Sequence, residues 1–87
     1  MPTVFIPPAM RELTGGIDRV RVEGSTLRRV VESLDQRFPG IAARLCNGDE
    51  LASGLAVSVD GHLSTRGLLT PVRSESEIHF LPAVGGG

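Results

Sequence analysis

The clearest periodic pattern in the chain predicts one amphipathic helix near its middle. Apolar residues recur at helical spacing over about three turns, at Leu27, Val30, Val31, Leu34 and Phe38. Ser25 or Thr26 precedes this stripe and supplies a side-chain oxygen for the helix N-cap, and Pro39-Gly40 ends the pattern. We expect Ile41–Leu45 to add one further helical turn.

Short runs of β-branched and alternating apolar residues predict strands on either side of this helix. The expected strands are Thr3–Ile6, Asp18–Glu23, Leu55–Val59, His62–Ser64 and Glu77–Leu81. Asp60-Gly61 is a two-residue hairpin signal, and Pro82 is expected to end the last strand. The remaining segments are expected to be connections: Pro8–Gly16, Asn47–Glu50 and Thr65–Glu75.

One amphipathic helix and about five short strands predict a two-layer α+β fold, in which the helix covers one face of a single mixed sheet. The alternation of strand residues places Ile6 and Phe80 toward the helix. Phe5 and Leu81 then point to the open face, where they form an apolar patch if the first and last strands are neighbours. We expect this patch to dock partner proteins. With the opposite strand parity, both residues would belong to the core.

Composition is typical of a folded globular protein. The 87 residues suit one domain, and 40% of them are hydrophobic. The net charge of −1 provides no basic excess for binding nucleic acid, and no apolar run is long enough to cross a membrane. The N-terminal residues lack the pattern of a secretory signal, so we expect a cytoplasmic protein.

Few side chains are candidates for chemistry. Cys46 is the one cysteine, which excludes an internal disulfide and a multi-cysteine zinc site, and we expect it to be a small buried apolar residue. His62 and His79 have no third ligand at metal spacing, so no metal site is predicted. Arg11-Glu12 is either a local ion pair or a docking element. All nine basic residues are Arg, so no lysine amine can accept an acyl group.

The most unusual segment is the last one, Pro82-Ala83-Val84-Gly85-Gly86-Gly87. Consecutive glycines can pass through a narrow channel, and an α-carboxyl group such as that of Gly87 is ionised near neutral pH. Extended, this segment reaches about 20 Å. We therefore expect a domain of residues 1–81 and a flexible tail of residues 82–87 that presents a carboxylate to a distant active site. A frayed terminus without a role is the alternative.

These motifs resemble, over essentially the whole chain, those of the small ubiquitin-like sulfur-carrier proteins of bacteria. That family includes the small subunit of molybdopterin synthase and the carriers for thiamine and cysteine biosynthesis. Thr3–Ile6 and Gly15-Gly16 are similar to its first strand and loop. The ending Leu81-Pro82-Ala83-Val84 looks most like the cysteine-biosynthesis branch, although Gly85 stands where the family usually has a variable residue before Gly-Gly. The resemblance implies a ubiquitin-like β-grasp fold.

The resemblance also implies a mechanism in which the chain is a co-substrate and not itself an enzyme. A ubiquitin-activating-like adenylyltransferase uses ATP to convert the Gly87 carboxylate into an acyl-adenylate, and the carrier binds no cofactor. A sulfur donor, either a sulfurtransferase or a desulfurase, then replaces AMP and leaves a thiocarboxylate. An acceptor synthase takes the sulfur while the tail threads its active site: Pro82, Ala83, Val84, Gly85 and Gly86. A cysteine-type synthase is the first interpretation, with molybdopterin, thiamine and secondary-metabolite pathways close behind.

Two other functions remain open. The chain is alternatively a ubiquitin-like modifier, whose Gly87 forms an amide with a lysine of another protein. Because it has no lysine, it cannot build isopeptide chains on itself. The third interpretation is a plain interaction module with an incidental tail, and deletion of Gly86-Gly87 would then leave its cellular role intact.

Overall fold

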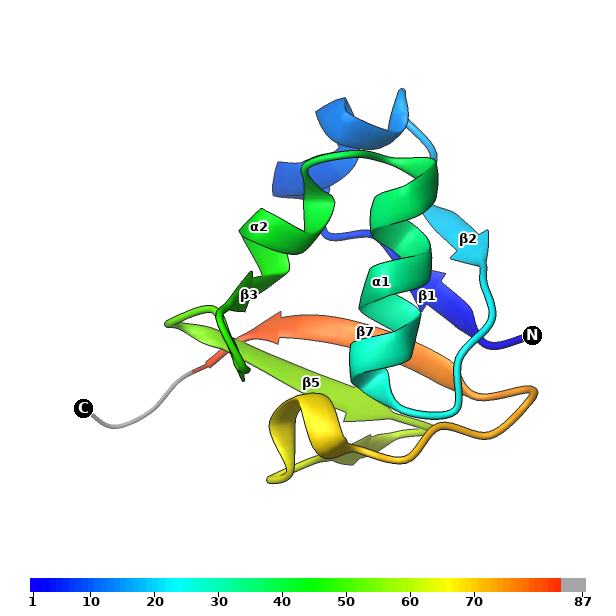
Figure 1. The fold of residues 1–87 in the computed structure, drawn as a ribbon, viewed down its shortest axis with the longest axis vertical. Helices are drawn as coiled ribbons and strands as arrows, with labels where there is room; N and C mark the ends of the chain where they lie inside the picture. The colour runs from blue at the N-terminus through cyan, green and yellow to red at the C-terminus, as the bar shows by residue number, and fades with distance from the viewer. Residues whose placement is uncertain (84–87) are drawn as a thin grey trace.

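One five-stranded sheet and the helix that crosses it dominate the structure (Figure 1). The computed structural model describes residues 1–83. The elements follow one another as β1 (Thr3–Phe5), the 3₁₀ helix η1 (Pro8–Thr14), β2 (Arg19–Arg21), α1 (Leu27–Arg37), α2 (Ile41–Leu45), β3 (Cys46–Asn47), β4 (Glu50–Leu51), β5 (Leu55–Val59), β6 (His62–Leu63), the 3₁₀ helix η2 (Gly67–Leu69) and β7 (Glu77–Pro82). The sheet order is β2-β1-β7-β5-β6, with β1 and β7 parallel and the other pairs antiparallel. The predicted α+β architecture with a mixed sheet is therefore confirmed.

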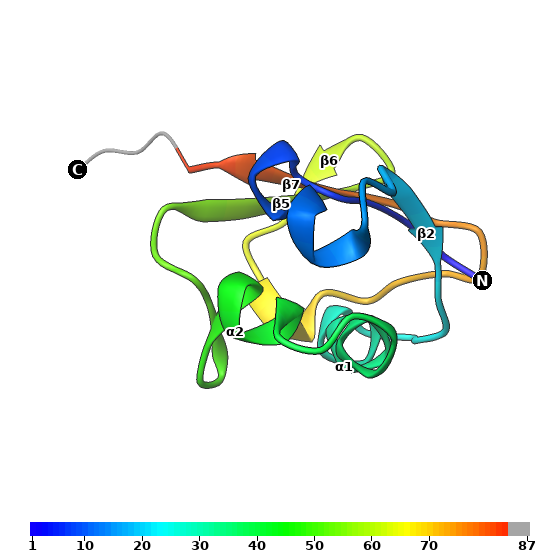
Figure 2. The ribbon, with the colours of Figure 1, turned by 90° about the horizontal axis from the view of Figure 1, so that it is seen from above.

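The helices form a second layer on one face of the sheet, as the view along α1 shows (Figure 2). The predicted apolar stripe is the buried side of α1, with Leu27, Val30, Val31 and Leu34 in the core. Thr26 caps the helix, because its Oγ1 accepts a hydrogen bond of 3.3 Å from the Arg29 amide. Within residues 1–83, no helix combines the length and apolar character needed to span a membrane.

Asp35 links the two helices. Its Oδ1 accepts hydrogen bonds from the amides of Gly40 at 3.1 Å and Ala42 at 3.0 Å. These amides belong to the start of α2, where the first N–H groups have no partner within the helix. The short α2 is therefore held by a carboxylate from α1, which explains why the predicted extra turn forms.

Three predicted connections contain regular structure. Pro8–Thr14 forms η1, and Gly67–Leu69 forms η2. The expected loop at Asn47–Glu50 is part of a small hairpin, in which β3 pairs with β4. The sequence did not reveal these elements, because β3, β4 and η2 are two or three residues long and η1 is a 3₁₀ helix without a periodic apolar pattern.

The prediction that Pro82 ends the last strand was wrong by one residue, because Pro82 pairs with Leu55 as the final residue of β7. The Ala83 amide donates to the Gly54 carbonyl at 2.8 Å, so odd-numbered residues of β7 direct their hydrogen bonds toward β5. The backbone nitrogen of Pro82, which carries no hydrogen, therefore faces the side of the sheet on which β1 lies. Since β1 ends at Phe5, no strand is paired with Pro82 on that side. No ladder hydrogen bond is lost there.

Candidate functional site at the end of the last strand

The candidate site lies where the described chain ends, beside the first residues of β5. Pro82 and Ala83 are exposed, and the hydrogen bond between Ala83 and Gly54 holds them in line with the sheet. The other predicted tail residues, Val84, Gly85, Gly86 and Gly87, lie outside the described residues. The structure thus provides the base from which the predicted tail begins.

The strand orientation predicted from the sequence is confirmed. Val4, Ile6, Ile78 and Phe80 are buried under the helices. Leu81 is 38% exposed on the opposite face, and Phe5 is half-buried there. Both residues therefore lie outside the core, while their predicted role in docking remains a prediction.

Phe5 and Leu81 nevertheless have different surroundings. Phe5 pairs with His79 across the parallel strands, and the two rings stack with centroids 4.1 Å apart. The Arg19 guanidinium lies 5.3 Å from the centroid of the Phe5 ring. Leu81 is two residues further along β7 and pairs with Ala56. The expected patch is thus a layered Arg19–Phe5–His79 stack with Leu81 beyond it.

An apolar groove adjoins Leu81 at the end of the sheet. Its volume is about 410 Å³, and it is lined by Pro7, Pro8, Ala9, Met10, Gly54, Leu55, Phe80, Leu81 and Pro82. We name this feature the tail-base groove. It exists because β1 pairs with β7 only as far as Phe5, after which Pro7 and Pro8 carry the chain into η1. The sequence analysis missed it, although the Pro-Pro pair after the first strand was a signal that this strand leaves the sheet early.

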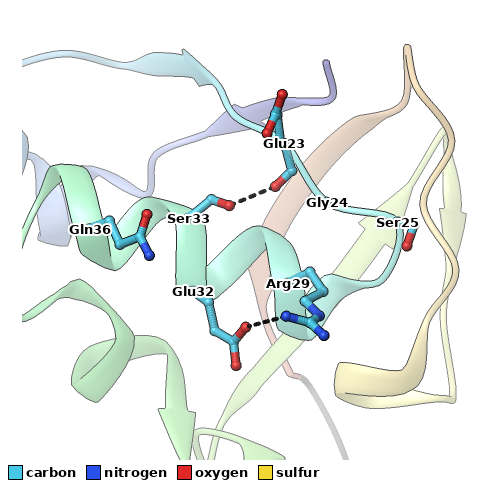
Figure 3. Close-up of a pocket in the computed structure, with 7 residues that line it drawn as sticks. All are labelled: Glu23, Gly24, Ser25, Arg29, Glu32, Ser33 and Gln36. Atoms are coloured by element: carbon cyan, nitrogen blue, oxygen red, sulfur yellow. Dashed lines mark hydrogen bonds and ion pairs between the residues drawn. The ribbon is translucent and has the colours of Figure 1, made fainter.

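A second pocket, polar and open, lies beside the first turns of α1 (Figure 3). Its lining groups already bond to one another: Ser33 donates to the Glu23 carbonyl at 2.8 Å, and Arg29 lies 3.7 Å from Glu32. Gly24 is required here, because a Cβ at this position would lie 2.6 Å from the Val30 amide nitrogen. Among residues 1–83, this pocket and the tail-base groove share no lining residue.

The remaining candidate side chains have structural roles. Cys46 is half-buried against the core, and burial raises the pKa of its thiol, opposed in part by the nearby Arg28. A protonated thiol is a weak nucleophile. His62 lies 3.1 Å from the Asp60 carbonyl, and His79 stacks on Phe5. Among residues 1–83, no group of three His, Cys, Asp or Glu side chains is placed to hold a metal ion.

Arg11 and Glu12 do not form the local ion pair that was one of the two predicted interpretations, while a docking role for them remains a prediction. Arg11 Nε donates to the Ile6 carbonyl at 3.2 Å, where it ties η1 to the end of β1. Glu12 lies 3.9 Å from Arg44 of α2. Both contacts fasten η1 to its neighbours, and η1 forms one wall of the tail-base groove.

Asp60 belongs to a network that the sequence did not reveal. Its carboxylate accepts hydrogen bonds from the Glu77 amide at 2.9 Å and from the Ser76 hydroxyl at 2.7 Å. These two contacts, the amide first, lower the pKa of Asp60. The predicted two-residue turn is confirmed, with positive φ of 52° at Asp60 and 84° at Gly61. The network joins this turn to the start of β7.

Comparison with known proteins places this geometry in a family. The sequence profile of the ThiS family matches residues 4–87. The sulfur carrier protein CysO of Mycobacterium tuberculosis is 31% identical over 90 residues, which cover 98% of this chain and 97% of that protein. A chain in the crystal structure of the Amycolatopsis orientalis BexX/CysO complex superposes with a TM-score of 0.90 at 32% identity, with 100% of both chains covered.

A modifier protein has a similar structure. The solution structure of small archaeal modifier protein 1 from Methanosarcina acetivorans superposes with a TM-score of 0.75 at 25% identity, covering 99% of this chain and 95% of that one. The sulfur-carrier relatives are more similar in both sequence and structure. The β-grasp fold is therefore confirmed, and the chain belongs to the ThiS family of ubiquitin-like sulfur-carrier proteins.

Proposed function

We propose that the chain carries sulfur as a thiocarboxylate on Gly87 and donates it to a biosynthetic synthase, with a cysteine-type synthase as the first candidate. The observation that carries this proposal is the full-length similarity to CysO sulfur carriers, together with a last strand that ends at Pro82, five residues before Gly87. Thiamine, molybdopterin and secondary-metabolite synthases are the alternative acceptors. We place this chemistry in the cytoplasm.

The proposed cycle begins with activation of a poor acyl donor. A carboxylate oxygen of Gly87 attacks the α-phosphorus of ATP on a ubiquitin-activating-like adenylyltransferase, and pyrophosphate leaves. A sulfurtransferase or desulfurase holds the sulfur as a persulfide, two thiol groups reduce it to hydrosulfide and become a disulfide, and the hydrosulfide attacks the acyl carbon. The bond between carbon and the AMP oxygen breaks, and the thiocarboxylate remains. ATP belongs to the enzyme, and the carrier contributes the reacting carbonyl without a cofactor of its own.

Partner enzymes supply the acid–base groups and the oxyanion site, while the carrier supplies a docking surface. We propose that Phe5 and Leu81 contribute to that surface. Both are apolar, accessible and on the face that the helices leave open. The crystallised complex of a similar CysO with BexX supports a protein partner for this carrier.

Intact-mass analysis of the chain purified from its native cells tests the proposal. Replacement of one oxygen by sulfur raises the mass by roughly 16 Da, and an alkylating reagent adds one alkyl group more to the thiocarboxylate species than to the carboxylate species, in which only the Cys46 thiol reacts. A population with this mass supports a sulfur carrier. High-mass conjugates through lysines of other proteins, without the thiocarboxylate, would establish the modifier function, which the similarity to small archaeal modifier protein 1 favours.

A further inference from the structure

We propose that Asn47 is a site of spontaneous modification, at which the side-chain amide is lost as ammonia and an aspartyl or isoaspartyl residue forms. Two dipeptides of the chain have a sequence that favours this reaction or the corresponding isomerisation of aspartate, Asn47-Gly48 and Asp60-Gly61, and each lies at a tight hairpin turn. Their contacts differ, and the difference directs the reaction to Asn47. The inference goes beyond the proposed function, because it requires no partner protein.

The reaction needs only water as a co-reactant. The Gly48 backbone nitrogen attacks the side-chain carbonyl carbon of Asn47, a C–N bond closes a cyclic imide, and the amide nitrogen leaves as ammonia with the proton of the Gly48 N–H. Water then opens the imide at either carbonyl. Opening at the side-chain carbonyl gives aspartate, and opening at the main-chain carbonyl gives isoaspartate, which lengthens the backbone at the turn. A following glycine favours the attack, because it has no side chain to shield its nitrogen.

Both reacting groups are free at the turn between β3 and β4. Asn47 and Gly48 are exposed, and within residues 1–83 the Asn47 amide group makes no hydrogen bond and the Gly48 N–H donates none. A Cβ on Gly48 would have no atom within 4 Å, so nothing hinders the approach of the two groups. The contact nearest to them in sequence joins Arg28 to Asp49 at 3.0 Å and involves neither group. The hairpin has only two residue pairs, so the local opening that ring closure requires costs little.

The corresponding side chain at the turn between β5 and β6 is held in place. Asp60 is also exposed, but its Oδ1 accepts a hydrogen bond from the Glu77 amide at 2.9 Å and its Oδ2 accepts one from the Ser76 hydroxyl at 2.7 Å. Attack by the Gly61 nitrogen would require the carboxyl group to leave both donors. The same contacts lower the pKa of Asp60, and an ionised carboxylate resists nucleophilic attack. Asp60-Gly61 is therefore protected, although it shares the reactive sequence pattern.

The variant Asp60→Asn tests this inference, because it creates the dipeptide Asn-Gly at both turns, so that the contacts distinguish the two positions. The amide oxygen at position 60 can still accept from the Glu77 amide, and the amide nitrogen can donate to the Ser76 hydroxyl. The full-length variant is incubated at mildly alkaline pH, once folded and once in guanidinium chloride. Peptide mapping with fragmentation then assigns each gain of roughly 1 Da to position 47 or 60 and separates isoaspartyl from aspartyl products.

In the folded variant, we expect position 47 to lose ammonia about tenfold or more faster than position 60, because the hydrogen bonds at position 60 must break before the ring can close. In guanidinium chloride, the two rates should agree within about twofold. Equal rates in the folded variant, or a faster reaction at position 60, would overturn the inference. A difference that persists unchanged in guanidinium chloride would also overturn it, because the neighbouring sequence would then set the rates.

The wild-type chain gives a second measurement that does not depend on the folding of a variant. Isoaspartate should accumulate at position 47 about tenfold or more faster than at position 60 in the folded protein, and accumulation at position 60 at the same rate would contradict the inference. Asn47→Gln is the matched control, because glutamine keeps an exposed amide but must close a larger ring, which forms slowly. The gain at position 47 should disappear in this control, and its persistence would rule out the proposed attack by the Gly48 nitrogen.

Discussion

The Phe5 ring lies almost flat on the His79 imidazole, with 9° between the planes and 4.1 Å between the centroids. These two residues face each other across the parallel pair β1 and β7, which are the first and last strands of the domain. The stack therefore ties the N-terminal strand to the strand from which the tail continues. It also places an aromatic ring on the open face, where a docking partner can meet it.

The double variant Phe5→Ser and Leu81→Ser should abolish adenylation while the fold survives. Both side chains lie on the open face, so their loss removes partner contacts and leaves the core intact. Exchange activity and a thermal melt of the same preparation measure the two effects. Leu69→Ser is the control, because Leu69 is 68% exposed but belongs to η2. A folded double variant that is adenylated like the wild type would contradict the docking role of these residues.

Gly24→Ala should lower the free energy of unfolding by about 2–4 kcal/mol, through overpacking and an unfavourable backbone angle. The added Cβ would meet the Val30 amide nitrogen at 2.6 Å and Val30 Cγ2 at 2.8 Å. Gly16→Ala provides the control, since Gly16 also has a positive φ, of 89°, but open space around a Cβ. It should cost only about 1 kcal/mol. If urea unfolding shows that Gly24→Ala and Gly16→Ala lose the same free energy of unfolding, the backbone near Val30 has shifted to relieve the clash.

Asp60→Asn should reduce the dependence of stability on acid pH. The folded-state pKa of Asp60 is lowered by the Glu77 amide and the Ser76 hydroxyl, so its contribution is present above the unfolded pKa of about 3.9. This contribution to stability is lost as the pH falls below the unfolded-state pKa and then through the lower pKa of the folded state. Asparagine tolerates the positive φ at this position.

Urea unfolding at neutral pH and near pH 3 measures this effect in the wild type and in Asp60→Asn. Asp18→Asn is the control, because only the backbone carbonyl of Asp18 takes part in a hydrogen bond among the described residues. The stability of Asp60→Asn should change less between the two pH values than that of the wild type or the control. The same change in all three proteins would contradict the assignment.

Asp35→Ala should destabilise the domain by about 1 kcal/mol, because the amides of Gly40 and Ala42 lose their acceptor. Asp35→Asn keeps a carbonyl oxygen at the same position and should recover much of the loss. Denaturant midpoints measure both. If the alanine variant is as stable as the wild type, water replaces the carboxylate at the start of α2 at no cost.

Features with a local origin could be predicted from the sequence. The apolar stripe of α1 repeats over a few residues, and the Asp60-Gly61 turn depends on two adjacent residues that accept positive φ. The orientation of Phe5 and Leu81 followed from strand alternation in the same way. The family motifs added the sheet order that these local signals do not contain.

Features that join distant segments could not be predicted. The tail-base groove depends on where β1 leaves β7, so it involves residues at both ends of the chain. The Asp35 cap depends on how α2 turns back after Gly40, and the Asp60 network on the approach of Ser76. Pro82 was misjudged for a related reason: its missing N–H matters only if a neighbouring strand is present on that side.

The direction in which β7 ends bears on how the proposed carrier would be shared among enzymes. Under the proposed function, every enzyme that acts on Gly87 would approach the end of the sheet at which β7 finishes. Charging and delivery would then be successive visits, with the carrier released between them. If the carrier bound either enzyme too tightly, its dissociation would limit turnover, so selection should favour rapid release over high affinity.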